Sequence, residues 1–419
     1  MSTQTVRLGL RENLAQFGLL VAINCFVGAM VGLERSTLPL IGEHDFGVRS
    51  GAAILSFITA FGLAKALTNL AAGGLAQRVG RRRLLIAGWV LALPVPLLIG
   101  VADSWAWVAV ANALLGLNQG LAWSMTVVMK IDLVGPTRRG LALGLNEAAG
   151  YLGVAAAAAL SGWLAADLAA RDVLVVGAAA IAVIALLVTI AAVRDTRAHV
   201  ALEQSRESGE PGGSAPSLRE ALADATYRRA ELRACSQAGL FNNLNDAVVW
   251  GVVPLYLAST GASVGQIGLV AGLYPAAWGL GQVPAGQWSD RVGRRLPIVA
   301  GMLLQAAALV VMAVSGGHIG VAVAAAVGLG AGTALVYPTL IAAISDQVAP
   351  IARAPVIGVY RFWRDTGYVL GGVTAGVAAD AVGYSGAIGA AAGLTAISGL
   401  VFAAQFGSRP VAATRALAR

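Results

Sequence analysis

The chain has 419 residues, of which 58% are hydrophobic and only 12% are Asp, Glu, Lys or Arg, and its mean hydropathy is +0.75. Soluble domains carry about a quarter charged residues, so this composition excludes an ordinary soluble globular protein. The net charge of +8 comes from 29 basic residues scattered over short segments. We interpret it as a signal of membrane topology, and no nucleic-acid partner is expected.

Twelve apolar runs are long enough to cross about 30 Å of hydrocarbon. Backbone polar groups in lipid need partners within the segment, so runs of this length are predicted to be helices. The predicted fold class is an all-α integral membrane protein with two pseudo-symmetric bundles of six helices. The runs are residues 14–40, 50–73, 84–101, 105–128, 140–165, 172–193, 233–258, 264–284, 296–314, 319–344, 354–378 and 383–406.

One long polar segment divides the chain. The predicted domains are residues 1–193 and 233–419, joined by a linker at 194–232. Residues 207–216 have the Gly, Ser and Pro content of a flexible linker. Ser217-x-x-Glu220 then has the form of a capping box and predicts a short amphipathic helix.

The basic residues predict the orientation of the chain in the membrane. An even number of spans places both termini on one side, and 23 of the 29 basic residues lie in the loops of that side, against 2 in the opposite loops. This asymmetry predicts that both termini are cytoplasmic. The 27 Arg against 2 Lys indicate a GC-rich bacterial source, so the predicted location is the bacterial cytoplasmic (inner) membrane.

Two motifs occur twice in the same order. Gly73-x3-Gln77-Arg78-x-Gly80-Arg81 recurs 213 residues later as Gly286-x3-Asp290-Arg291-x-Gly293-Arg294. Asp132-x3-Pro136-x2-Arg139-x4-Gly144 recurs 214 residues later as Asp346-x3-Pro350-x2-Arg353-x4-Gly358. Repeats in the same order are typical of transporters built from parallel halves.

The duplicated first motif, between the second and third spans of each half, resembles the signature of the major facilitator superfamily. The resemblance implies that the motif braces a cytoplasmic gate, in which the Asp accepts hydrogen bonds from a neighbouring helix end. Gln77 stands where the family has Asp, so we expect weaker, neutral hydrogen bonds in the first half. The predicted gate residues are Gly73, Gln77, Arg78, Gly80, Arg81, Gly286, Asp290, Arg291, Gly293 and Arg294.

An ionisable residue inside a span costs about 2.5–3.5 kcal/mol on insertion scales and is therefore a functional hypothesis. Asp246 is the first choice for the carboxylate that couples transport to protons, because Asn243, Asp246 and Trp250 share one helix face. The alternative is a structural hydrogen bond to a neighbouring helix. The further candidates for proton coupling are Glu147, Glu34 and Asp365; Glu34 has an interfacial cluster as its alternative role.

Polar and aromatic residues in the spans predict a substrate site. Arg361 lies at the repeat position of Glu147, so the two could pair across a cavity or hold the ends of a zwitterion; a structural ion pair between Arg361 and Asp365 is the alternative. Tyr274 and Trp278 are set aside because aromatic residues near span ends are often interfacial anchors. The predicted substrate-binding residues are Arg35, Asn118, Gln119, Trp123, Asn146, Asn242, Asn243, Trp250, Tyr337, Arg361, Trp363 and Arg364.

Two other classes of protein are considered. Neither Lys65 nor Lys130 follows a glycine, so no P-loop for an ATP-driven pump exists. Gly261-x-Ser263-x-Gly265 matches a hydrolase motif that requires a strand–turn–helix context, and Ser263 is instead predicted to cap a helix. No enzymatic activity, cofactor or metal site is expected.

The sequence predicts a monomeric secondary active transporter in the lipid bilayer that moves a small polar or charged organic molecule by alternating access. Proton-coupled efflux by antiport is favoured. The alternative is proton-coupled uptake by symport of an organic anion, a zwitterion or a metal complex. A channel or an intramembrane enzyme is a remote alternative.

Overall fold

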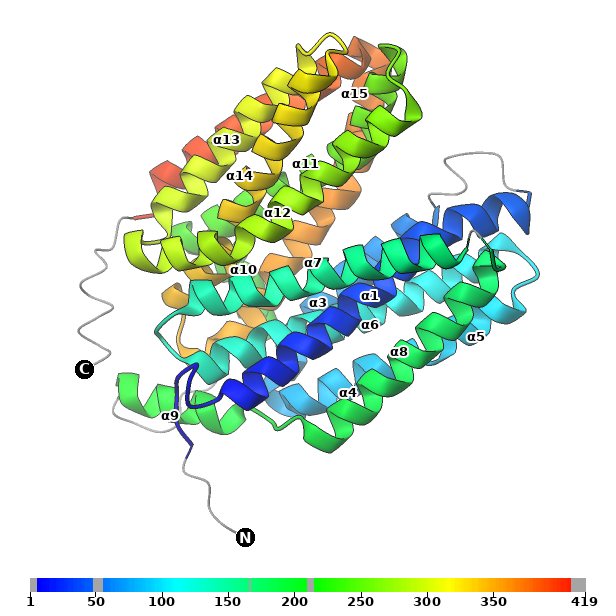
Figure 1. Ribbon diagram of the computed structural model, residues 1–419. Helices are drawn as coiled ribbons and strands as arrows, with labels where there is room; N and C mark the ends of the chain where they lie inside the picture. Colours follow the sequence, from blue (N-terminus) through cyan, green and yellow to red (C-terminus); the bar gives the residue numbers. More distant parts are fainter. Residues whose placement is uncertain (1–5, 48–55, 166, 209–214, 408–419) are drawn as a thin grey trace. The chain divides into compact units, whose positions relative to one another are not determined.

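The computed structural model describes residues 6–47, 56–165, 167–208 and 215–407, and the regular secondary structure of these residues is helical (Figure 1). The first half contains α1 (Leu14–His44), α3 (Ser56–Val79), α4 (Arg81–Ala92), α5 (Pro94–Val101), α6 (Trp105–Val134), α7 (Arg139–Leu164) and α8 (Ala170–Ala192). The linker contains α9 (Arg197–Ser208), α10 (Leu218–Ala223) and a π-helical turn at Asp224–Arg228. The second half contains α11 (Ala230–Ser259), α12 (Val264–Val292), α13 (Arg295–Ala313), α14 (Ile319–Gln347), a 3₁₀ turn at Pro350–Ala352 and α15 (Arg353–Gln405).

A helix lies at each of the twelve predicted spans. The third span is divided into α4 and α5 just before Pro94, a residue that lacks the N–H needed to continue an α-helix. The 53 residues of α15 cover two spans, because Gly383 has a non-helical backbone with φ 73° and ψ 169°. The all-helical fold of twelve spans is thus confirmed, and seven helical segments of the described residues are long and apolar enough to cross a membrane.

Several helices continue beyond the apolar run that predicts them. The run that ends at residue 128 belongs to α6, which ends at Val134, and the run that ends at residue 284 belongs to α12, which ends at Val292. Apolar runs mark the part of a helix that lies in lipid, whereas the helix continues through its polar end. Lys130, which the sequence interpretation places in a loop, therefore lies within α6.

The linker contains more helix than its composition predicts. Residues 197–208 form α9, which includes the start of the segment interpreted as flexible; residues 209–214 of that segment lie outside the described residues. The predicted short helix begins at Leu218, directly after Ser217.

The helices form two compact units, which differ from the predicted domains in two short segments. Unit 1 comprises Met1–Gly135, Asn146–Leu218 and Pro350–Gly358; unit 2 comprises Pro136–Leu145, Arg219–Ala349 and Val359–Arg419. In unit 1, α6 packs against α3 and α4, and α1 packs against α8. In unit 2, α14 packs against α12 and α13. The beginning of α7 thus groups with second-half helices, and residues 350–358 group with first-half helices.

Close helix packing at equivalent glycines extends the sequence repeat. A Cβ atom at Gly153 of α7 would lie 2.2 Å from the carbonyl oxygen of Cys25 in α1. A Cβ atom at Gly367 of α15, 214 residues later, would lie 2.1 Å from the carbonyl oxygen of Leu240 in α11. Only glycine permits the two backbones to approach this closely, so each unit contains the same helix contact.

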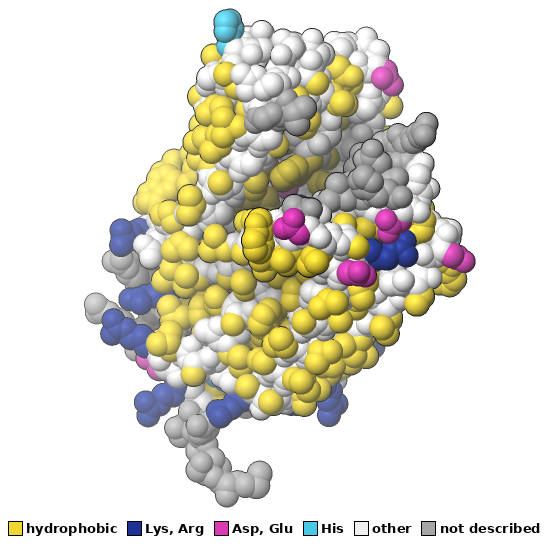
Figure 2. Space-filling model, turned by 45° about the vertical axis from the view of Figure 1, so that its right-hand side comes forward, with side chains coloured by type: hydrophobic (Ala, Val, Ile, Leu, Met, Phe, Trp, Pro, Cys, Tyr) yellow, Lys and Arg dark blue, Asp and Glu magenta, His cyan; other side chains and the backbone are white. Residues whose placement is uncertain are grey.

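The surface of the protein is apolar over large areas. Hydrophobic side chains cover much of the face shown in Figure 2, and most of the Lys and Arg side chains on that face lie at its lower edges. Leu280 is 75% exposed, Trp163 69% and Val176 68%. Such side chains are expected on helix faces that contact lipid.

Candidate substrate and coupling sites

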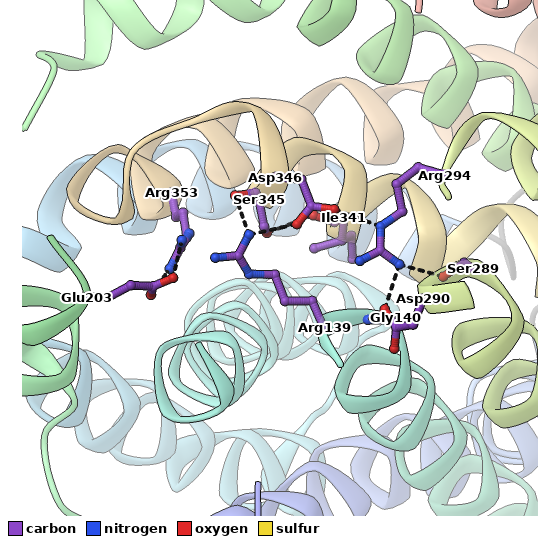
Figure 3. Close-up of polar contacts among 10 residues, drawn as sticks. All are labelled: Arg139, Gly140, Glu203, Ser289, Asp290, Arg294, Ile341, Ser345, Asp346 and Arg353. Atoms are coloured by element: carbon purple, nitrogen blue, oxygen red, sulfur yellow. Dashed lines mark hydrogen bonds and ion pairs between the residues drawn. The ribbon is translucent and has the colours of Figure 1, made fainter. Parts of the chain in front are cut away.

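In unit 2, the second copy of the first motif holds the beginning of α7. The Asp290 carboxylate accepts a hydrogen bond of 2.9 Å from the backbone N–H of Gly140 (Figure 3) and another of 2.9 Å from the backbone N–H of Leu141. Arg294 also donates to Asp290, at 2.7 Å. The first N–H groups of a helix have no acceptor within it, and the positive end of the helix dipole attracts an anion. Asp290 satisfies both requirements.

Asp346, from the second motif, completes the unit 2 motif cluster, which we define as Arg139, Gly140, Asp290, Arg294 and Asp346. Its carboxylate accepts hydrogen bonds from Arg294 at 2.8 Å and from Arg139 at 2.7 Å (Figure 3). Two cations and two anions therefore balance in a largely buried network of charge-assisted hydrogen bonds. The two motifs, separate in sequence, form one structural element.

In unit 1, the uncharged Gln77 amide stands where unit 2 has the Asp290 carboxylate. This amide donates to the carbonyl oxygen of Ile351 at 2.7 Å, and its Oε1 accepts from Arg81 at 2.8 Å. Arg81 also pairs with Asp132 at 3.3 Å, and both side chains are fully buried. The pair Arg81–Asp132 is thus the repeat equivalent of Arg294–Asp346.

A carboxylate from the linker completes the unit 1 motif cluster, defined as Gln77, Arg81, Asp132, Glu203 and Arg353. Glu203 lies on α9 and forms a two-pronged salt bridge with Arg353, in which Nη2 lies 2.8 Å from Oε1 and Nη1 donates to Oε2 (Figure 3). The two side chains are 2% and 1% exposed. Arg353 is the repeat equivalent of Arg139, whose partner is the motif residue Asp346. In unit 1 this partner comes from outside the motifs.

The motif glycines have the backbone geometry that the turns require. Gly80 has φ 96° and Gly293 has φ 88°, values that side chains other than glycine rarely adopt. Gly73 approaches the backbone of Ala354, and Gly286 approaches that of Gly140. The predicted gate residues Arg78 and Arg291 are exposed, so they lie at the periphery of these clusters.

Asp195 anchors the start of α4 beside this turn. Its carboxylate accepts from the backbone N–H of Arg82 at 3.2 Å and from the backbone and side chain of Arg197 at 3.0 and 2.9 Å. Burial raises the pKa of Asp195, but these hydrogen bonds and the Arg197 charge outweigh burial and hold the pKa below its ordinary value. Asp195 therefore remains an anion at the helix N-terminus at neutral pH.

The interior of unit 1 contains a chain of hydrogen bonds between α6 and α7. The Trp123 indole donates to both carboxylate oxygens of Glu147, at 3.1 and 3.2 Å, and Asn146 donates to Glu147 at 2.8 Å. Lys130 donates to the Oδ1 of Asn146. The ammonium group of Lys65 lies 5.4 Å from the Trp123 ring. Three predicted site residues, Glu147, Asn146 and Trp123, are thus brought together.

Other predicted residues of unit 1 lie apart from this chain of hydrogen bonds. Asn118 donates to the carbonyl oxygen of Gly88 at 2.9 Å and Gln119 to that of Val27 at 2.8 Å, so both join helices. Glu34 is buried, and among the described residues its Oε1 has no hydrogen-bond partner. Arg35, the next residue, is exposed.

The interior of unit 2 places Asp246 at the meeting point of three helices. Asp246 of α11 accepts a hydrogen bond from the phenol of Tyr274 in α12. The same phenol lies 3.3 Å from the hydroxyl of Thr333 in α14. Thr333 donates its own proton to the carbonyl oxygen of Leu329 at 3.0 Å. The Tyr274 proton therefore has two acceptors within reach, a carboxylate and a hydroxyl.

A row of aromatic rings adjoins Asp246. The centroids of Trp250 and Tyr274 are 6.4 Å apart, those of Tyr274 and Trp278 are 5.9 Å apart, and those of Trp278 and Tyr337 are 5.6 Å apart. Tyr274, Trp278 and Tyr337 are buried, whereas Trp250 is 40% exposed. Setting aside Tyr274 and Trp278 as interfacial anchors is therefore wrong, since both line the interior around the predicted coupling carboxylate.

The structure does not contain the alternative ion pair considered for the charged face of α15. Within the described residues, Asp365 pairs with its neighbour Arg364 and not with Arg361. The Arg364 guanidinium also lies 4.9 Å from the centre of the Tyr337 ring. Arg361 is fully buried, and none of its three side-chain nitrogens has a hydrogen-bond partner among the described residues.

The remaining predicted residues of unit 2 contact other parts of the unit. Asn242 accepts a hydrogen bond from Gln305 of α13 at 3.0 Å, so it faces α13. Asn243 is buried. Trp363 donates to the hydroxyl of Thr226 at 3.0 Å, in the π-helical turn that precedes α11. The ring row described above does not include Trp363.

Ser263 caps α12, as its position in the sequence predicts. It forms a complete capping box with Gln266, in which each side chain accepts a hydrogen bond from the other residue's backbone N–H. The surrounding glycines therefore flank a helix start and not the strand–turn–helix that the hydrolase motif requires.

The sequence interpretation does not include several residues of these clusters among the site residues. It places Lys130 in a loop and Glu203 in a polar linker, and it sets Tyr274 and Trp278 aside. The apolar residues that precede Lys130, Val127-Val-Met129, are a sign that the helix continues. No comparable local signal marks Glu203, because its partner Arg353 lies 150 residues away.

The twelve helices, the repeated motif clusters and the polar residues in the helix interiors define a multi-pass membrane protein built from two similar halves. The sequence profile of the Major Facilitator Superfamily matches residues 14–231 and 236–418. The chain therefore belongs to this superfamily, whose members are secondary transporters.

Solved transporters share the fold at low sequence identity. A single-residue variant of the E. coli fucose:proton symporter FucP matches with a TM-score of 0.73 and 16% identity, over 94% of this chain and 98% of that one. The human organic anion transporter MFSD10 matches with a TM-score of 0.72 and 17% identity, over 92% and 99%. The proton:xylose symporter XylE matches with a TM-score of 0.74 and 13% identity, over 94% and 97%. Identities this low show the fold alone.

Proposed function

We propose that this protein is a proton-coupled transporter of a small polar or charged organic molecule and that Asp246 carries the coupled proton. The membrane is the bacterial cytoplasmic membrane, with both termini in the cytoplasm. The proposal keeps the outward, antiport direction of the sequence interpretation, with inward symport as the alternative. The observation that carries the proposal is the contact of Asp246, Tyr274 and Thr333.

The geometry of this contact makes it a switch between two hydrogen-bonding states. The Tyr274 phenol donates a hydrogen bond to Asp246, and an Asp246 anion is the stronger acceptor of this proton. When Asp246 takes up a proton, it loses most of its strength as an acceptor, and the Tyr274 proton turns to Thr333. Protonation on α11 thereby changes the contact between α12 and α14, the kind of coupling that alternating access requires.

The motif clusters supply the part that must open and close. Charge-assisted hydrogen bonds join the beginning of α7 to α12 and α14 through Asp290 and Asp346. Such hydrogen bonds are strong and specific in geometry, so together they favour one arrangement of these helices. We assign them the role of a gate on the cytoplasmic side.

The test first identifies a ligand by thermal stability and then measures its transport. Thermal stability of the purified protein is screened at about pH 6 and pH 8 against amino acids, organic anions, sugars, cationic drugs and metal complexes, because a ligand of the folded state raises its stability. The ligand found is then used in proteoliposomes. Asp246→Asn should abolish transport driven by a pH gradient and retain exchange of labelled for unlabelled ligand.

Two results would contradict the proposal. Asp246→Asn could still concentrate the ligand against its gradient when only a pH difference is imposed, which would exclude Asp246 as the coupling group. Wild-type transport could also be independent of the pH gradient, which would exclude proton coupling altogether. The sign of the gradient that drives accumulation separates antiport from symport.

A further inference from the structure

Arg361 is a buried cation without a counterpart. Its side chain is fully buried, and Nε, Nη1 and Nη2 all lack hydrogen-bond partners among the described residues. A guanidinium carries five N–H donors and remains charged at any physiological pH. An uncompensated buried charge is strongly destabilising, so a protein retains one only where something else neutralises it.

The surrounding charges of unit 2 do not neutralise Arg361. On the same face of α15, one turn further along, Arg364 pairs with Asp365 and lies over the Tyr337 ring. Asp246 of α11 is bound by Tyr274. Arg364 and Asp365 balance each other, which leaves the Arg361 charge unmatched by any ion pair within the described residues.

We propose that Arg361 binds the carboxylate group of the transported molecule and that this molecule is a monocarboxylate. One unpaired guanidinium supplies one positive charge and a planar fork that matches a carboxylate with two parallel hydrogen bonds. A dianion would require a second free cation, and Arg364 is already paired. Tyr337, at the end of the row of aromatic rings, contacts Arg364, which lies one helical turn from Arg361. The rings would form an apolar wall beside the carboxylate.

This inference rests on the proposed transport function and gives it a substrate class. It also explains why the protein keeps two arginines close together on one helix. Arg364 has fixed partners and holds α15 against α14, whereas Arg361 has its donors free for a ligand.

The test uses the purified full-length protein and compares two substitutions one helical turn apart. Arg361→Gln removes an unmatched charge and should leave the melting temperature without ligand unchanged or raised. Arg364→Gln, the matched control, removes the ion pair with Asp365 and should lower the melting temperature. A clear loss of stability in Arg361→Gln would show that Arg361 is a structural group and would overturn the proposal.

Ligand binding is measured with acetate, lactate and benzoate, each beside its primary amide, and with succinate and phosphate as dianions. At least one monocarboxylate should stabilise the wild type while its amide does not. Arg361→Gln should raise the apparent Kd for that carboxylate by about tenfold or more, the effect of losing a charged hydrogen bond. Arg361→Lys keeps the positive charge but not the planar guanidinium. Its apparent Kd should lie between those of the wild type and Arg361→Gln.

Stabilisation by the amides as well as the acids, or by none of the monocarboxylates, would overturn the assignment. A preference for succinate or phosphate would overturn the monoanion class. Failure of this inference is distinguishable from failure of proton coupling. If carboxylate binding depends on Arg361 but transport is independent of the pH gradient, the anion site is retained and the coupling role of Asp246 is rejected.

Discussion

Lys130 shows how a charged side chain is held inside unit 1. It is fully buried and donates to Asn146, which in turn donates to Glu147. The amide thus relays hydrogen bonding between a cation on α6 and an anion on α7. Both side chains are fully buried, so we expect each charge to contribute to the compensation of the other.

We therefore predict strong coupling between Lys130 and Glu147. Lys130→Met and Glu147→Gln should each lower the free energy of unfolding by about 3–5 kcal/mol, because each leaves the opposite charge buried alone. The double variant should be destabilised by much less than the sum. The measurement is chemical unfolding of the four proteins in mixed micelles, and effects that add within about 0.5 kcal/mol would show that the two charges are independent.

At the scale of helices, α9 is a structural part of unit 1 and not only a connection. It supplies Glu203 to Arg353, at the repeat position where unit 2 uses a residue of its own second motif. The first half also has Gln77 in place of the motif Asp. The first motif of unit 1 thus has one carboxylate fewer than that of unit 2, and Glu203 of the linker adds one carboxylate to the unit 1 cluster.

This arrangement predicts a large effect from a small change in the linker. Glu203→Gln should destabilise the protein by about 3–5 kcal/mol, because it removes one charge of the buried two-pronged salt bridge with Arg353. Arg206→Gln, at an exposed position of the same helix, should change stability by less than about 0.5 kcal/mol. Thermal unfolding of the two variants provides the comparison.

A second substitution should restore part of the lost stability. Gln77→Asp restores the motif carboxylate beside Arg81 and should recover part of the stability that Glu203→Gln loses. Equal stability of wild type and Glu203→Gln would show that α9 contributes nothing to the cluster.

At the scale of the whole molecule, periodicity and hydropathy predict the number and order of the helices, because lipid requires long apolar segments whose backbone bonds are internal. The duplicated motifs predict which loops carry charge networks. Helix ends are less well predicted: the polar last turns of α6 and α12 lie outside the apolar runs.

Partners of individual side chains are the least predictable feature. Asp365 has two arginines within one turn, and spacing alone favours Arg361. The carboxylate instead pairs with Arg364, whose guanidinium also lies over the Tyr337 ring. Tyr274 contacts Asp246 from another helix, and Glu203 meets Arg353 across 150 residues of chain. Such pairings depend on tertiary packing, which a single sequence pattern does not encode.

The central claim is that binding of the transported molecule is linked to the protonation of Asp246. The most direct measurement is the number of protons exchanged on ligand binding, obtained by calorimetry in buffers of different ionisation enthalpy near pH 7. Wild type should exchange a substantial fraction of one proton per ligand, and Asp246→Asn should bind the same ligand with none. Equal proton exchange in both proteins, or none in the wild type, would contradict the account.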